Sequence, residues 1–246
     1  MTELPIPTDP HYLGQPAPKH PAKFSAGFIE IFRELLGNWL PRPWKYDTPL
    51  VLDPFAGVGT IHQLRPQFAT FGLEIEQEWA DCSEFTYCAD STQMSEYWTG
   101  MFQAIVTSPT YGNRMADHHN AKDASKRNTY KHTLGHDLQP NNTGQMQFGQ
   151  YGYYSIHEKV YKECRRVLEA GGLFILNVSD HIRQGERIEV CKWHAGILKS
   201  LDFELMFEHP VVTQRLGFGA NGNLRVPNEV IYVFRKGPWS VTKPTI

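Results

Sequence analysis

The stretch VLDPFAGVGT, from Val51 to Thr60, contains the turn on which the fold assignment depends. A short apolar run ends at Asp53, and Gly57 and Gly59 follow shortly after it. Glycine permits a tight turn from a strand into a helix, and it lets the backbone approach a ligand closely. A lone G-x-G pair also occurs in turns that bind nothing. A cofactor loop and a plain structural turn are therefore both open at this point.

Further apolar runs follow at regular intervals and extend the pattern. FATFGLEI, FTYCAD and FQAIVTS alternate with polar, helix-compatible stretches, which is typical of a parallel sheet covered on both faces. LFILNVSD adds a fifth strand, and FELMFEHPVV and NEVIYVFRK predict an antiparallel hairpin at the end of the sheet. The sequence thus predicts an α/β fold with a mostly parallel, seven-stranded sheet and helices on both faces.

Three stripes of apolar residues at helical spacing predict the main helices. Their members are Phe28, Ile31, Phe32, Leu35 and Trp39 after a possible N-cap at Ser25; Ile156, Val160, Cys164, Val167 and Leu168; and Ile188, Cys191, Ala195 and Leu198. Between Tyr111 and the second stripe the periodicity lapses over a long segment. A loop of that length inside a compact domain is usually functional or disordered.

The bulk composition predicts one domain over residues 1–246, preceded by a proline-rich arm at residues 1–24. No apolar run is long enough to cross a bilayer and no signal peptide is evident, so we expect a cytoplasmic, intracellular protein without membrane contact. The four cysteines form no CxxC unit and are expected to be reduced thiols. The net charge of −2 implies that any nucleic-acid binding depends on a local basic segment.

Carboxylates close the second and third predicted strands. Glu74 lies where a carboxylate can accept hydrogen bonds from a ribose diol, and Asp90 could reach an adenine amino group. The dinucleotide pattern G-x-G-x-x-G is absent because Ile61 and His62 follow Thr60, which disfavours NAD. Glu76 is expected to be solvated. Each acid alone is weak evidence for a nucleotide site.

The fourth predicted strand ends in TSPTYGNR, from Thr107 to Arg114. Alone, Ser-Pro-Thr-Tyr is read most simply as a strand terminator with a buried ring. Together, however, DPFAGVGT, GLEIE and TSPTYGNR resemble the S-adenosylmethionine-dependent DNA methyltransferases that modify an exocyclic amino group. HPAKFS, at residues 20–25, resembles the segment that helps to hold the methionine end of the cofactor in that family. The resemblance extends from about His20 to Gly237.

The resemblance implies a Rossmann-like class I methyltransferase fold, S-adenosylmethionine as cofactor and double-stranded DNA as partner, in a bacterial or phage context such as restriction–modification. It carries cofactor contacts over to Lys23, Phe24, Ser25, Asp53, Phe55, Gly57, Gly59, Thr60, Glu74, Ile75, Asp90, Ser91 and Ser108. We expect no metal, because the histidines of the long segment lack paired cysteines or a carboxylate at fixed spacing.

The resemblance also implies the catalytic roles. Ser108 Oγ and the carbonyl of Pro109 would accept hydrogen bonds from the target amine, and Tyr111 would stack on the flipped base. Serine at the head of the tetrapeptide favours N4 of cytosine in this family, with N6 of adenine open. Thr110 departs from the family, which usually has a second proline there, so a constraint on φ is lost.

Residues 112–152 are expected to form an inserted, DNA-facing target-recognition segment, with a solvated loop as the alternative. Its proposed phosphate contacts are Arg114, Lys122, Lys126, Arg127 and Lys131, and Arg215 and Arg225 lie in a second candidate loop.

Three other functions stay open: methylation of RNA, methylation of a protein glutamine, and DNA binding without catalysis. A cytosine C5 enzyme is disfavoured because no cysteine follows a proline. The sequence leaves both a monomer and a homodimer open.

Overall fold

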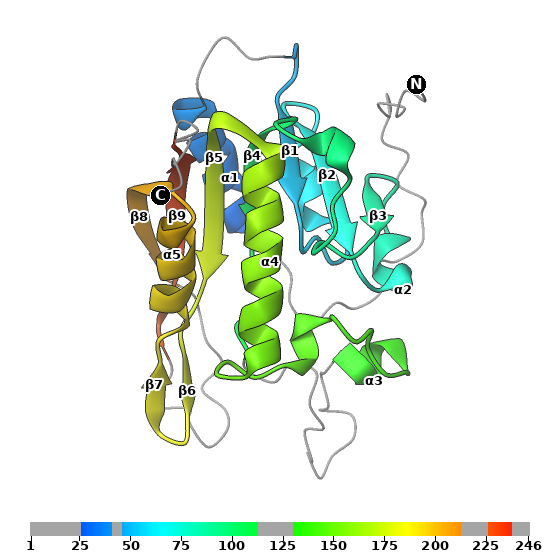
Figure 1. The fold of residues 1–246 in the computed structure, drawn as a ribbon, viewed down its shortest axis with the longest axis vertical. Coiled ribbons are helices and arrows are strands. Elements are labelled where there is room, and N and C mark those ends of the chain that lie inside the picture. The colour runs from blue at the N-terminus through cyan, green and yellow to red at the C-terminus, as the bar shows by residue number, and fades with distance from the viewer. Residues whose placement is uncertain (1–25, 41–45, 113–129, 213–225, 238–246) are drawn as a thin grey trace, which may run out of the picture.

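The computed structural model describes residues 26–40, 46–112, 130–212 and 226–237 (Figure 1). A seven-stranded sheet runs through this part of the chain. In spatial order its strands are β3 (Thr86–Cys88), β2 (Ala69–Glu74), β1 (Leu50–Asp53), β4 (Phe102–Thr107), β5 (Leu168–Val178), β9 (Asn228–Lys236) and β8 (Phe203–Val212).

The neighbouring pairs from β3 to β5 are parallel, whereas β9 is antiparallel to both β5 and β8. The expected mostly parallel sheet with an antiparallel terminal hairpin is confirmed. The chain leaves β1 toward β2 on one side and returns to β4 on the other. Ligands of open α/β sheets bind beside the carboxyl ends of strands at such a reversal, so the strand order makes the ends of β1 and β4 the candidate site.

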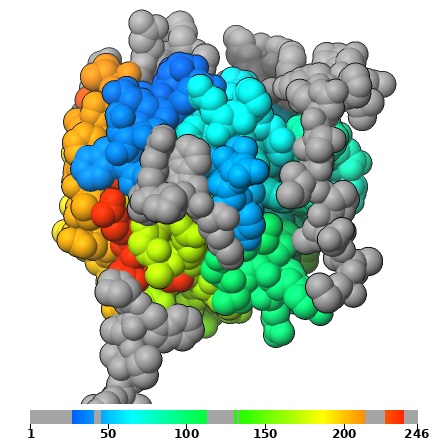
Figure 2. Space-filling model, turned by 90° about the horizontal axis from the view of Figure 1, so that it is seen from above, coloured from blue at the N-terminus to red at the C-terminus, as the bar shows by residue number. Residues whose placement is uncertain are grey.

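Helices cover both faces of the sheet, as expected. The helix α1 (Ala26–Trp39) packs with the 3₁₀ helix η1 (Thr60–Leu64) on one face, while α4 (Tyr151–Val167) and α5 (Val190–Ser200) pack on the other. Seen from above (Figure 2), blue α1 and the yellow-green junction of α4 and β5 lie on different sides of the molecule. Each fully buried Leu, Ile or Phe in these layers contributes about 1.5–3 kcal/mol.

The helical stripes are largely confirmed. Phe28, Phe32 and Leu35 are buried on α1, and the predicted apolar residues of α4 from Ile156 to Val167 are buried against the sheet, whereas Leu168 begins β5. Ile188 lies in a strand rather than in α5. Ser25, the expected N-cap of the first helix, lies outside the described residues, as does the arm at 1–24.

The connections near the glycine loop contain less helix than the sequence suggested. Only η1, the one-turn helix α2 (Gln77–Ala80) and the 3₁₀ helix η2 (Glu96–Trp98) lie between β1 and β4. The glycine turn occupies the start of the first connection, and Pro66 cannot continue a helix. At its carboxyl end, each of β1, β2 and β3 therefore continues into turns and helices of one or two turns.

Small elements gather at the carboxyl end of the sheet, the lower end in Figure 1. They are α3 (Tyr130–Leu134), the 3₁₀ helix η4 (Thr143–Gln145) and an unpredicted hairpin of β6 (His181–Arg183) and β7 (Glu186–Ile188). The hairpin turn contains Gly185 at φ 84° and Gln184 at φ 52°. None of the described helices is both long and apolar enough to span a membrane.

The described part of the long inserted segment is packed on the domain. Tyr130, Leu138 and Asn142 are buried, and the ring of Tyr130 lies edge-on to Trp79 at 5.1 Å between centroids. These residues therefore cannot face DNA. Residues 113–129 of the expected DNA-facing segment lie outside the described residues.

Candidate active site

The carboxyl ends of β1 and β4 are joined by a buried hydrogen bond. Thr107 Oγ1 donates to Asp53 Oδ1 at 2.7 Å, and the same oxygen accepts from the backbone N–H of Phe55 at 3.0 Å. The strand that leads into the glycine loop and the strand that leads into Ser-Pro-Thr-Tyr are thus held side by side. The glycine loop and the Ser-Pro-Thr-Tyr segment thus lie next to each other at the carboxyl end of the sheet, as predicted.

Asp53 retains one acceptor without a donor. Its side chain is buried, and Oδ2 has no hydrogen-bond partner among the described residues. Burial raises the pKa of Asp53 to about 7, against the lowering effect of the hydrogen bonds from Thr107 and Phe55. A buried anionic oxygen without a donor is costly unless a polar or cationic group meets it. Asp53 Oδ2 therefore provides a fitting partner for an ammonium group.

The two loop glycines have different roles. Gly57 has φ 53°, and its N–H donates to Glu74 Oε2 at 3.0 Å. Gly59 has φ 77°, and a Cβ there would lie 2.6 Å from Cδ2 of His62. The half-buried ring of His62 is held by Thr70 and Thr86 at 2.8 Å each. The packing of His62 thus requires glycine at position 59 whether or not a ligand binds.

Glu74 closes β2 and clamps the glycine loop. Besides the bond from Gly57, its Oε1 accepts from the N–H groups of Ile75 and Glu76, both at 2.9 Å. Burial raises the pKa of Glu74 to about 7, although these three backbone donors act in the opposite direction. A carboxylate offers about four acceptor positions, so these donors leave room for one further hydrogen bond. Glu74 cannot accept both hydroxyls of a diol without releasing a backbone donor.

The turn after β3 is fixed in a similar way. Asp90 accepts from the Thr92 N–H at 2.8 Å and from Asn141 Nδ2 at 2.7 Å, while Ser91 Oγ donates to the Pro54 carbonyl at 2.6 Å. Burial opposes ionisation of Asp90, but the hydrogen bonds outweigh it and the pKa is lowered. Asp90 is therefore an ionised acceptor beside the glycine loop.

Glu76 is buried, and the expectation that it is solvated is wrong. Its Oε1 accepts from the Gln139 N–H at 2.9 Å and from Asn142 Nδ2 at 2.8 Å. The segment that supplies these donors is distant in sequence, so a local reading of GLEIE cannot reveal the contact. Glu76 ties the inserted segment to the carboxyl end of β2.

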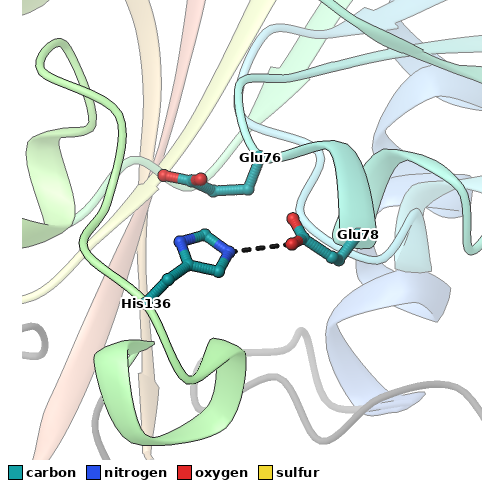
Figure 3. Close-up of side chains that lie close together, drawn as sticks. All are labelled: Glu76, Glu78 and His136. Carbon is teal, nitrogen blue, oxygen red and sulfur yellow. Dashed lines mark hydrogen bonds and ion pairs between the residues drawn. The ribbon is translucent and has the colours of Figure 1, made fainter.

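Glu76, Glu78 and His136 offer ligand atoms within 4.8 Å of one another (Figure 3). His136 Nε2 lies 2.8 Å from Glu78 Oε1, and His136 Nδ1 lies 2.7 Å from the carbonyl oxygen of Asp137. Hydrogen bonding to Asp137 and Glu78 raises the pKa of His136. Both ring nitrogens of His136 thus have acceptors within the protein.

The predicted catalytic residues share a network with two side chains that the sequence did not single out. Ser108 Oγ lies 2.9 Å from the Tyr111 hydroxyl, which donates to Glu229 Oε2 at 3.0 Å. Asn177 Nδ2 donates to the same carboxylate oxygen at 2.8 Å and lies 3.2 Å from the Tyr111 hydroxyl. Asn177 is the second-last residue of β5, which pairs with β4, and Glu229 is the second residue of β9, which pairs with β5. The sheet order brings the end of β5 and the start of β9 close to the end of β4, and this order is the signal from which the two residues could have been identified.

The network determines to which group the Ser108 hydroxyl donates its proton. Because the Tyr111 hydroxyl donates to Glu229, it accepts the proton of Ser108. Ser108 Oγ also accepts from Asn177 Nδ2 at 3.4 Å, which leaves one lone pair with which it can bind a further donor. The expectation that the Tyr111 ring stacks on a base stays a prediction.

The loop beyond Pro109 is held on both sides. The Thr110 carbonyl accepts from the Tyr153 hydroxyl at 2.7 Å, and Thr110 Oγ1 donates to Thr143 Oγ1 at 2.8 Å. The Gly112 carbonyl accepts from Arg183 Nη2 at 2.8 Å. Although Thr110 replaces a second proline, hydrogen bonds from Tyr153 and Arg183 and to Thr143 hold the loop.

Most of the expected DNA contacts cannot be located. Arg114, Lys122, Lys126, Arg127, Arg215 and Arg225 lie outside the described residues, as do the expected cofactor contacts Lys23, Phe24 and Ser25. Lys131 is described, and its Nζ pairs with Asp137 Oδ1 at 2.6 Å. The carboxylate of Asp137 partly neutralises Lys131 and would compete with a phosphate for its ammonium group.

The comparisons with known proteins agree with this arrangement. A family model described as DNA methylase matches residues 102–245, which begin at β4. The search of curated proteins gave no match. A SAM-dependent methyltransferase from Methanosarcina mazei has a similar structure, with a TM-score of 0.52, 12% identity, and coverage of 82% of this chain and 97% of that one. The N-methyltransferase NodS from Bradyrhizobium japonicum has a TM-score of 0.50 at 12% identity, covering 87% of this chain and 99% of its own. At these identities the likeness supports the fold alone.

Proposed function

The chain belongs to the DNA methylase family, and we propose that it transfers a methyl group to an exocyclic amine of a flipped DNA base. N4 of cytosine is the first candidate and N6 of adenine the second. The fold is that of class I SAM-dependent methyltransferases, and S-adenosylmethionine is the cofactor. The hydrogen bond between Thr107 and Asp53 carries the proposal, because it places the two motif loops side by side.

The residues at the carboxyl ends of β1 to β3 fit the cofactor. Asp53 Oδ2, buried and without a donor among the described residues, would receive the ammonium group of the methionine moiety. Glu74 would accept a ribose hydroxyl at its remaining position, and Asp90 would face the adenine. Phe55, Gly57, Gly59, Thr60, Ile75 and Ser91 complete the proposed contacts, with Lys23, Phe24 and Ser25 outside the described residues.

The amine of cytosine or adenine is a poor nucleophile because its lone pair is delocalised into the ring. Ser108 Oγ and the Pro109 carbonyl would accept the amine hydrogens, which orients the nitrogen and localises its lone pair. When bound, S-adenosylmethionine supplies an electrophilic methyl group. The protein then contributes mainly positioning, which can account for about 7–11 kcal/mol of a barrier.

Glu229 and Tyr111 support the acceptor role of Ser108. The proton of Ser108 is directed to Tyr111, and that of Tyr111 to Glu229. A carboxylate at the end of this chain increases the electron density on Ser108 Oγ, because hydrogen bonds in series polarise one another. Ser108 Oγ can thus accept a hydrogen bond from the target amine but has no proton left to donate to it.

A base inside a duplex cannot reach a pocket at the strand ends, so it must leave the stack. Aromatic stacking is worth about 1–3 kcal/mol per base, and the ring of Tyr111 would provide it. The Tyr111 hydroxyl lies 2.9 Å from Ser108 Oγ, where a target amine would also bind. Because Ser108 Oγ donates its proton to Tyr111 and accepts at a lone pair, it can hold Tyr111 and the target amine together.

The proposal is tested by offering methyl-labelled S-adenosylmethionine with duplex DNA, single-stranded DNA, RNA and protein in parallel. We expect label in DNA, with a preference for the duplex. Label confined to RNA or protein would support the corresponding alternative. Binding of the cofactor and DNA without transfer to any substrate would indicate a non-catalytic protein.

A further inference from the structure

A chain of buried hydrogen bonds connects helices α4 and α5 to the catalytic loop. The Tyr161 hydroxyl lies 2.7 Å from His194 Nδ1, His194 Nε2 lies 2.8 Å from the Tyr153 hydroxyl, and that hydroxyl lies 2.7 Å from the Thr110 carbonyl oxygen. Tyr153, Tyr161 and His194 are each 0% exposed. No water competes for these contacts, so their donors and acceptors must match.

The last contact sets the direction of the whole chain. A backbone carbonyl can only accept, so the single proton of the Tyr153 hydroxyl is donated to Thr110. The Tyr153 oxygen then accepts from His194 Nε2–H. Burial, together with the nearby His157, lowers the pKa of His194 well below its ordinary value, so the ring is neutral. His194 Nδ1 is therefore an acceptor, and it receives the proton of Tyr161.

Thr110 has a second anchor on its side chain. Thr110 Oγ1 donates to Thr143 Oγ1 at 2.8 Å, and Thr143 is buried at the start of η4. Threonine, unlike proline, does not restrict φ through a ring. The conformation of the peptide after Pro109 is thus determined by contacts with α4 and η4 rather than by the covalent structure of residue 110.

We propose that Tyr153 and His194 are positioning residues, which hold the Thr110 peptide so that the Pro109 carbonyl and Tyr111 are aimed at the target base. This inference rests on the proposed function. The Thr110 carbonyl belongs to the peptide that joins Thr110 to Tyr111, and the Pro109 carbonyl lies in the preceding peptide, so a shift of the Thr110 backbone moves both catalytic groups. A displacement of about 1 Å can lower a rate by about a hundredfold.

The variant Tyr153→Phe tests the role with little change in packing. It retains the ring, which lies 4.2 Å from the His157 ring and 5.6 Å from the Phe148 ring between centroids. It removes the hydroxyl that binds Thr110 and leaves His194 Nε2–H without an acceptor. Some loss of stability is therefore expected from any role of the hydroxyl, and a matched control is needed.

Tyr161→Phe provides that control. It removes another buried hydroxyl of α4, one that also binds His194. It leaves the hydrogen bond between Tyr153 and Thr110 in place. At a temperature where all proteins are folded, we expect kcat for DNA methylation to fall about tenfold or more in Tyr153→Phe. The Kd for S-adenosylmethionine should not change, and kcat of Tyr161→Phe should stay close to that of the wild type. Equal kcat values in the two variants would overturn the inference.

Hydrogen–deuterium exchange provides a readout that needs no substrate. In the peptide that spans Ser108 to Gly112, we expect faster exchange in Tyr153→Phe than in the wild type or Tyr161→Phe. Unchanged exchange in Tyr153→Phe would overturn the inference even if the wild type methylates DNA. If the wild type methylates nothing, the proposed function fails, while the exchange rates still decide whether Tyr153 holds the loop.

Discussion

Asp53 links cofactor affinity to pH. Its pKa of about 7 means that a large fraction of the ligand-free protein carries a proton there near neutrality. Because the cofactor's ammonium group binds the carboxylate form, we expect the affinity to rise as pH increases from about 5 to about 7, by up to about tenfold per pH unit for each linked ionisation, and to level off above the ligand-free pKa. Titration calorimetry at several pH values measures this dependence.

Asp53→Asn should weaken binding and reduce the slope of log Kd against pH. Glu74, whose pKa is also about 7, should retain part of the slope. A wild-type affinity that does not change over this pH range would show that Asp53 does not bind the ammonium group.

Ser108→Ala removes one of the two proposed acceptors of the target amine. We expect kcat to fall about a hundredfold or more, by analogy with the loss of one transition-state hydrogen bond. The Kd for S-adenosylmethionine should change little, because the Asp53 and Glu74 contacts do not involve Ser108. Ser95→Ala, at an exposed position, is the control. Full turnover in Ser108→Ala would contradict the assignment of the catalytic loop.

At the scale of elements, the contact between β2 and the inserted segment is expected to contribute to stability. Glu76→Ala removes a buried carboxylate that accepts from Gln139 and Asn142, and hydrogen bonds to charged groups are worth about 1.5–3 kcal/mol each. We expect the free energy of unfolding in urea to decrease by about 2–4 kcal/mol, since the two bonds are not additive.

Glu78→Gln is the neighbouring control. Glu78 is exposed and pairs with an exposed histidine, so its replacement should alter the stability little. Equal effects of the Glu76 and Glu78 substitutions would show that the inserted segment is not held through Glu76.

The elements differ in how well the sequence predicts them. Apolar runs and helical stripes indicated the seven strands and the helices α1, α4 and α5, because burial on the sheet requires those patterns. The short connections from η1 to η2 could not be told from helices by composition. The roles of Glu76, Asn177 and Glu229 depend on partners far away in sequence, so no local motif contains them. The positions of Asp53, Glu74 and Ser108 at the carboxyl ends of strands could be predicted, because each ends or directly follows an apolar run.

At the scale of the whole molecule, the net charge of −2 requires DNA binding to depend on local basic residues. Each phosphate contact contributes about −0.9 to the slope of log K against log salt. We expect Lys126→Gln and Arg127→Gln to weaken DNA binding and to make this slope less steep. Lys131→Gln should have a smaller effect, because Lys131 is paired with Asp137. Fluorescence anisotropy at several salt concentrations measures the slopes, and unchanged slopes would place the DNA surface elsewhere.

The identity of the methylated nucleoside tests the central claim most directly. Duplex DNA is incubated with the protein and methyl-labelled S-adenosylmethionine, digested to nucleosides and analysed by mass spectrometry against synthetic standards. The account predicts labelled N4-methyldeoxycytidine, or N6-methyldeoxyadenosine if adenine is the target, and little of either with Ser108→Ala. Labelled 5-methyldeoxycytidine, or no labelled nucleoside although the cofactor binds, would contradict it.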